Sequence, residues 1–117
     1  MIDTKVLFIP QLLGLCKTAV ENGPQWGTAT NDLNLTVLSW KNGQGVTEHV
    51  NNELDVLWLA LEGTAEISID GELFPLEQGG AIVIPRGASR ALKSTSADFK
   101  YISIHKRRAG LQIENRI

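Results

Sequence analysis

The sequence predicts an all-β protein with one domain, built as a small barrel or sandwich. Short apolar or alternating segments follow one another from residue 33 to residue 105, and glycine-containing turns separate them. Only one segment, near the N-terminus, has helical spacing. Such a succession of short strands and regular turns is typical of barrels and sandwiches. With 117 residues, the chain has the length of one domain with a single core.

The composition is that of a soluble globular protein, with 43% hydrophobic and 21% charged residues. A net charge of −2 gives no reason to expect nucleic acid or an anionic membrane as a partner. No apolar run approaches the length of a membrane-spanning helix, and residues 1–10 lack the pattern of a secretory signal. Cys16 is the single cysteine, so no internal disulfide can form. We therefore expect a cytoplasmic protein.

Residues 1–31 are predicted to form a helical and irregular arm that packs on the barrel. Apolar residues recur there at the spacing of one helix face: Leu12, Leu13, Leu15, Cys16 and Ala19. Pro10 lies near the first turn of this helix, where a missing N–H costs little. The helix is expected to end at residues 22–24, and residues 25–31 are expected to be irregular.

The barrel is predicted to span residues 32–106, followed by a tail over residues 107–117. Its strands, in order, cover residues 33–40, 46–50, 56–61, 64–69, 72–76, 81–84, 89–93 and 99–105. Asp70 and Gly71 join two of these strands and are a strong hairpin signal, because both residue types tolerate positive φ. Pro75 cannot donate to a sheet ladder, which places its strand at a sheet edge or at the end of a strand.

The strand over residues 56–61 is apolar at every position, so both of its faces need cover. One face can point into the barrel, and a partner subunit could cover the other. We therefore expect a homodimer.

Charged residues are unevenly distributed along the chain. Between Asn42 and Pro85 there are eight acidic residues and no Lys or Arg, whereas eight basic residues follow from Arg86 onward. We expect acidic and basic strands to lie near each other, within one barrel or across a dimer.

Two glycine-punctuated segments carry a motif pattern. The first runs Gly43, five residues, His49-Val-Asn51, four residues, Val56, six residues, Gly63. The second runs Gly79, five residues, Pro85-Arg-Gly87, two residues, Arg90, three residues, Ser94. This spacing resembles the two motifs of the cupin superfamily and covers roughly the middle half of the chain. The resemblance implies a single jelly-roll-like cupin β-barrel with a short N-terminal helical segment.

In metal-binding cupins, two histidines and a glutamate of the first motif and a histidine of the second hold a divalent metal. Carried over position by position, the resemblance assigns these places to His49, Asn51, Val56 and Arg90. Asparagine offers a weak oxygen, valine offers nothing and arginine carries a charge that repels a cation. We therefore expect the usual metal site to be lost and no cofactor to be bound.

The preferred function is that of a metal-independent cupin that binds a small polar or anionic molecule in the barrel cavity. The expected ligand-binding residues are His49, Asn51, Glu53, Asp55, Arg90 and Tyr101. Arg90 could bind a carboxylate or phosphate through its guanidinium fork. Alternatively, it could pair with an internal acid such as Glu53 or Asp55.

Two enzymatic alternatives remain open, and the sequence does not decide whether any reaction is catalysed. One is a metal-dependent oxygenase or isomerase with non-standard ligands: His49, Glu53, Asp55 and His105. The other is a metal-free isomerase or epimerase that uses a histidine with a tyrosine, and it depends on fold analogy. Against the metal site, acids such as Glu53 and Asp55 more often cap a loop or pair with nearby bases.

Overall fold

The structure, a computed structural model of the chain, describes residues 6–16 and 21–107. This part of the chain contains one short 3-10 helix and nine strands. They are η1 Leu13–Cys16, β1 Gly23–Ala29, β2 Leu33–Lys41, β3 Gly45–Val50, β4 Val56–Glu62, β5 Thr64–Ile69, β6 Glu72–Glu77, β7 Ala81–Ile84, β8 Ser89–Ser94 and β9 Asp98–Lys106. The all-β class predicted from the sequence is confirmed.

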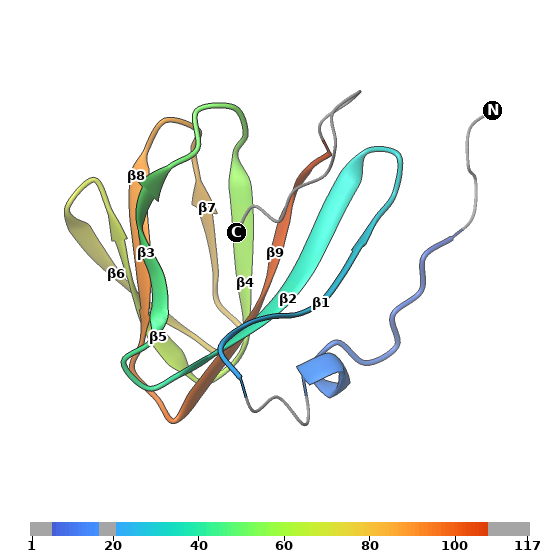
Figure 1. The fold of residues 1–117 in the computed structure, drawn as a ribbon, viewed down its shortest axis with the longest axis horizontal. Helices are drawn as coiled ribbons and strands as arrows, with labels where there is room; N and C mark the ends of the chain where they lie inside the picture. Colours follow the sequence, from blue (N-terminus) through green and yellow to red (C-terminus); the bar gives the residue numbers. More distant parts are fainter. Residues whose placement is uncertain (1–5, 17–20, 108–117) are drawn as a thin grey trace.

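The strands form two antiparallel sheets that face each other (Figure 1). One sheet has five strands in the order β1-β2-β9-β4-β7, and the other has four in the order β3-β8-β5-β6. Chain neighbours therefore often lie in different sheets, which is the crossing connectivity of a jelly roll. The observed strands 33–41 to 98–106 agree with the predicted ranges to within two residues.

The main core lies between the two sheets and is rich in aromatic rings. Trp58, Phe99 and Tyr101 are fully buried there. The ring centroids of Trp58 and Tyr101 are 5.4 Å apart in an edge-on arrangement, and those of Phe99 and Tyr101 are 5.3 Å apart and stacked. Such pairs contribute about 0.5–1.5 kcal/mol beyond their area burial, so this cluster stabilises the inner face of the five-stranded sheet, to which all three residues belong.

A second apolar cluster covers the outer face of the five-stranded sheet. It is centred on Val37 and Ile102, and the N-terminal residues Leu12, Leu13 and Leu15 pack against it. The arm therefore covers part of this face, as expected. Val83 on β7 remains 62% exposed and Leu33 on β2 remains 46% exposed.

The N-terminal arm differs from its prediction in two respects. The expected helix is a single 3-10 turn, Leu13–Cys16, and Ala19 lies outside the described residues. Residues 25–31, expected to be irregular, mostly belong to β1, which pairs with β2 through contacts such as Trp26 opposite Val37. Gly14 weakens a helix by about 1 kcal/mol relative to alanine, and the open edge of β2 offers hydrogen bonds that only a neighbouring strand can use.

Turns and edges behave as the sequence indicates. Asp70 and Gly71 have φ of 50° and 85°, the positive values that a tight hairpin turn requires. Pro75 lies in β6, the edge strand of the four-stranded sheet.

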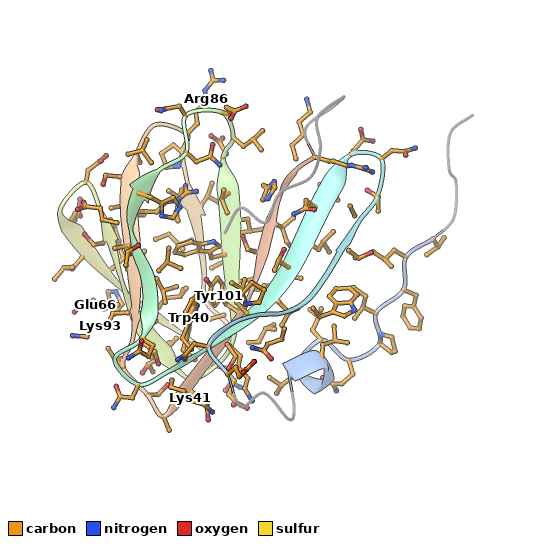
Figure 2. All side chains as sticks on the ribbon, viewed as in Figure 1. Trp40, Lys41, Glu66, Arg86, Lys93 and Tyr101 are labelled. Atoms are coloured by element: carbon orange, nitrogen blue, oxygen red, sulfur yellow. The ribbon has the colours of Figure 1, made fainter. Side chains whose placement is uncertain are left out.

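The expected proximity of acidic and basic strands is confirmed within the barrel. Lys100 Nζ lies 3.3 Å from Glu62 Oε2, which joins β9 to β4. Glu66 on β5 lies opposite Lys93 on β8, and the two side chains are neighbours in Figure 2. Among the described residues, no helix is long and apolar enough to span a membrane.

Candidate functional site

The inner wall of the barrel changes from apolar to polar along its length. On the five-stranded sheet, β2 and β9 pair Trp40 with Phe99, Leu38 with Tyr101, Thr36 with Ser103 and Asn34 with His105. Because Leu38, Trp40, Phe99 and Tyr101 belong to the inner core, alternation places the other four side chains on the same inner face. Lys41 and Arg86 mark the two ends of the barrel in Figure 2, and the polar end lies towards Arg86.

On the four-stranded sheet, the polar end carries His49 and Arg90 as direct cross-strand neighbours. Val46 also packs on the inner core, although strict alternation would place residues 46 and 49 on opposite faces. The register shift between these two positions in β3 resolves the difference, because a bulge adds a residue and changes which side chains face inward.

Arg90 is the central polar residue of this interior, and only 1% of it is exposed. Its Nε donates to His49 Nε2 over 3.4 Å, whereas its Nη1 is buried and has no hydrogen-bond partner in the part of the chain that the structure describes. No carboxylate of residues 6–16 and 21–107 lies within ion-pair distance of it. Burial is the main influence on the pKa of Arg90 and lowers it, while Tyr101 acts in the opposite direction. A guanidinium nevertheless keeps its charge in proteins, so Arg90 is a buried cation without a carboxylate partner among the described residues.

Both described histidines have hydrogen-bond partners at both ring nitrogens. His49 Nδ1 lies 3.0 Å from the carbonyl oxygen of Thr47, so Nδ1 carries the proton and Nε2 accepts from Arg90. His105 Nδ1 lies 3.0 Å from the carbonyl oxygen of Lys106, and its Nε2 lies 3.3 Å from Asn34 Nδ2. These contacts fit two neutral imidazoles, each with a protonated Nδ1.

Tyr101 is fully buried in the same interior. Its hydroxyl oxygen accepts a hydrogen bond of 3.2 Å from Trp40 Nε1, and the two side chains lie together in Figure 2. Burial is the main cause that raises the pKa of the Tyr101 phenol above its ordinary value. The hydroxyl therefore stays protonated at neutral pH and keeps its hydrogen as a donor.

Three residues expected at the site lie in the loop between β3 and β4. Asn51 Oδ1 accepts from the backbone N–H groups of Glu53 and Leu54, at 2.9 and 3.1 Å. Asp55 Oδ1 accepts from the backbone N–H of Arg86 at 2.9 Å. Asn51 and Asp55 therefore hold loops at the polar end, and the structure does not bring Glu53 or Asp55 to Arg90 as an ion-pair partner. Both acids are exposed beside a surface recess.

The four positions that correspond to the ligands of metal-binding cupins do not fit a metal here. Val56 is a buried hydrocarbon in the core, Arg90 is a cation and Asn51 Oδ1 already accepts two hydrogen bonds. Over the described ranges 6–16 and 21–107, no three His, Cys, Asp or Glu side chains gather in a group that could hold a metal ion. The alternative ligand set His49, Glu53, Asp55 and His105 is therefore not assembled among these residues.

Two inner residues outside the expected site have unused polar atoms. Trp58 Nε1 and Ser103 Oγ are buried without a hydrogen-bond partner among the described residues, and the two residues lie directly opposite each other on β4 and β9. Ser39 Oγ is also without a partner, but alternation places it on the outer face. The period-2 pattern places Trp58 and Ser103 inward, but the sequence has no signal for missing partners.

No protein-family model and no curated protein matches this sequence. Solved structures do resemble the chain. KdgF from a Halomonas species is 26% identical, with a TM-score of 0.69 over 79% of this chain and 86% of KdgF. A cupin-2 domain protein from Shewanella frigidimarina is 19% identical, with a TM-score of 0.64 over 81% of this chain and 88% of that protein. A double-stranded β-helix protein from Klebsiella pneumoniae is 20% identical, with a TM-score of 0.72 over 84% and 83% of the two chains.

The chain has the cupin fold. The resemblance seen in the sequence is thereby confirmed. The glycines of the two motifs made it recognisable, because the backbone conformation at their turns requires glycine. Gly63 and Gly79 have φ of 81° and 87°, a backbone region that glycine adopts readily and other residues rarely do. At Gly63, a Cβ atom would also collide with the carbonyl oxygen of Asp98. The chain therefore keeps the residues that shape the turns of this fold, while the positions that hold metal in metal-binding cupins carry other chemistry.

Proposed function

We propose that this cupin binds a small polar or anionic molecule in the barrel interior, without a metal, through Arg90 and His49. The observation that carries the proposal is Arg90, a cation only 1% exposed, with an unpartnered Nη1 and no carboxylate nearby in the described residues.

Energetics favour this interpretation of Arg90 over a purely structural role. The effective penalty for burying an ion is several kcal/mol, and an unpaired buried charge leaves that penalty uncompensated. A bound anion would supply the missing charge and the missing acceptor together, through short charge-assisted hydrogen bonds. The contact with His49 Nε2 holds the guanidinium at one edge and leaves Nη1 for the ligand.

The hydrogen bonds of the histidines support metal independence. A metal would have to displace Arg90 from His49 Nε2, or Asn34 from His105 Nε2. Elemental analysis of protein purified without chelator tests this, and we expect less than one Fe, Mn, Ni or Zn per chain. One tightly bound metal per chain, lost on His49→Ala, would instead favour the metal-dependent alternative.

Thermal melts with added ligands test the binding proposal. A ligand that binds only the folded state stabilises it by about 2.7 kcal/mol at a hundredfold excess over its Kd. We expect at least one compound among carboxylates, phosphates and sugar phosphates to raise the melting temperature of the wild type. Arg90→Met should not respond. Arg86→Met is the matched control, because Arg86 is exposed at the same end of the barrel, and it should respond like the wild type (Figure 2). A response that survives Arg90→Met would contradict the proposal.

A further inference from the structure

The unused hydrogen-bonding capacity of the interior consists mainly of donors. Arg90 Nη1 and Trp58 Nε1 are buried N–H groups without acceptors. Tyr101 accepts from Trp40 and keeps its own hydroxyl hydrogen. Ser103 Oγ can donate or accept and lies opposite Trp58. A ligand that forms hydrogen bonds with these donors must therefore carry hydrogen-bond acceptors.

These groups belong to one neighbourhood in the core. The rings of Trp58 and Tyr101 are in edge-on contact at 5.4 Å. Arg90 is buried and alternates with Ala88 and Leu92, which belong to the same core cluster as Trp58 and Tyr101. The cation of the four-stranded sheet and the indole of the five-stranded sheet therefore face the same interior. Each orphaned donor is more than nine-tenths buried, and a buried polar group without a partner costs about 1–3 kcal/mol.

The net charge of the interior favours an anion with a single negative charge. Arg90 is the single charged side chain among the buried residues of the described ranges, and the hydrogen bonds of His49 and His105 fit neutral rings. A carboxylate, with one negative charge, compensates Arg90 completely. A phosphate ester carries about −1.5 to −2 charges at pH 7 and would leave a net negative charge in a poorly solvated site.

We infer that the ligand is a small monocarboxylate whose oxygens accept from Arg90 Nη1 and Trp58 Nε1. This inference depends on the proposed function and narrows it to one chemical class. The aromatic rings of Trp58, Phe99 and Tyr101 suit an apolar remainder of the molecule.

Indole N–H signals in a ¹H–¹⁵N NMR spectrum test the inference directly. The chain has three tryptophans, so it gives three indole signals, and loss of one in Trp58→Phe assigns Trp58. Trp40 already donates to Tyr101, and Trp26 packs on the outer face, so both serve as internal controls. The probes are propionate and benzoate, their neutral counterparts propionamide and benzamide, and inorganic phosphate, all at constant ionic strength.

We expect propionate or benzoate to shift the Trp58 signal in a saturable way, while the amides and phosphate leave it in place. Arg90→Met should weaken the effect about tenfold or more, since it removes a charge-assisted hydrogen bond. Arg90→Lys provides a second variant that keeps the charge, and it should still prefer the acid to the amide. Trp58→Phe should reduce the stabilisation by carboxylate in thermal melts.

Several results would overturn the inference. Amides or phosphate that shift Trp58 as strongly as the acids would exclude the monocarboxylate class and leave the proposed function standing. Equal shifts of Trp26 and Trp40 would indicate an adventitious additive only. If no probe shifts Trp58 but a compound that is not a monocarboxylate stabilises the wild type and not Arg90→Met, the class is wrong and the function holds. If no compound shifts the Trp58 signal and none stabilises the wild type, both the monocarboxylate inference and the proposed function are wrong.

Discussion

Arg90→Met should stabilise the ligand-free protein, although it removes a partly buried hydrogen bond. Arg90 is 1% exposed and donates through Nε to His49 Nε2 at 3.4 Å, which is a long contact. Losing it costs at most about 1 kcal/mol, because His49 is only half-buried and water can replace the donor. The stability gained from removing a desolvated and unpaired cation is larger than this loss, since the cation no longer has to be buried.

The net effect follows from comparing these contributions. Replacing buried ionic groups by apolar residues of similar volume is often neutral or stabilising by about 1–4 kcal/mol. For a chain of 117 residues, 1 kcal/mol corresponds to a melting-temperature change of roughly 3–6 °C. We therefore expect Arg90→Met to melt at least about 3 °C higher than the wild type in buffer without added anions.

Chemical denaturation with urea and a thermal melt measure this directly, and equal m-values show that the denatured state is unchanged. The exposed control Arg86→Met should stay within about 0.5 kcal/mol of the wild type. A loss of about 3–5 kcal/mol in Arg90→Met would refute the reasoning, because it would mean that a buried carboxylate has lost its partner.

Three further outcomes follow from the structure. We propose a homodimer that covers the outer face of the five-stranded sheet, so light scattering should give twice the 12.8 kDa chain mass. Val83 is 62% exposed on that face, and Val83→Lys should yield a monomer. Leu73 is 58% exposed on the other sheet, so Leu73→Lys should leave the dimer intact. A wild-type monomer at micromolar concentration would rule the dimer out. Gly79→Ala should lower the free energy of unfolding by about 1–2 kcal/mol, because of its positive φ alone. Gly63→Ala should lower it clearly more in a urea titration, because the added Cβ meets a backbone oxygen. Equal losses of stability in the two variants would contradict this. Burial raises the pKa of Tyr101, the single tyrosine, so the folded protein should show no phenolate absorbance at about pH 10–11. The free energy of unfolding should fall as the pH rises above about 10, because the phenol ionises first in the unfolded chain. Titration of the native protein near about pH 10 would mean that the phenol reaches solvent.

Much of the fold could be predicted from local chemistry. Alternation and unbroken apolar runs define strands by side-chain period, and Asp70-Gly71 requires the positive φ found there. The motif glycines were visible because the backbone at those turns excludes other residues. The N-terminal arm was less predictable, since β1 forms where the free edge of β2 supplies hydrogen bonds, and no local pattern in residues 25–31 shows this.

The site divides in the same way. The sequence by itself determined that the usual metal positions carry Asn51, Val56 and Arg90, because ligand chemistry depends on residue type. Only the tertiary structure decided that Asn51 and Asp55 hold loops, and that Arg90 lies beside His49 without a carboxylate in the described residues. It also decided that Trp58 and Ser103 have no partners. The physical reason is that a hydrogen bond or an ion pair is a relation between groups far apart in the chain, and a bulge such as that in β3 changes which side chains meet.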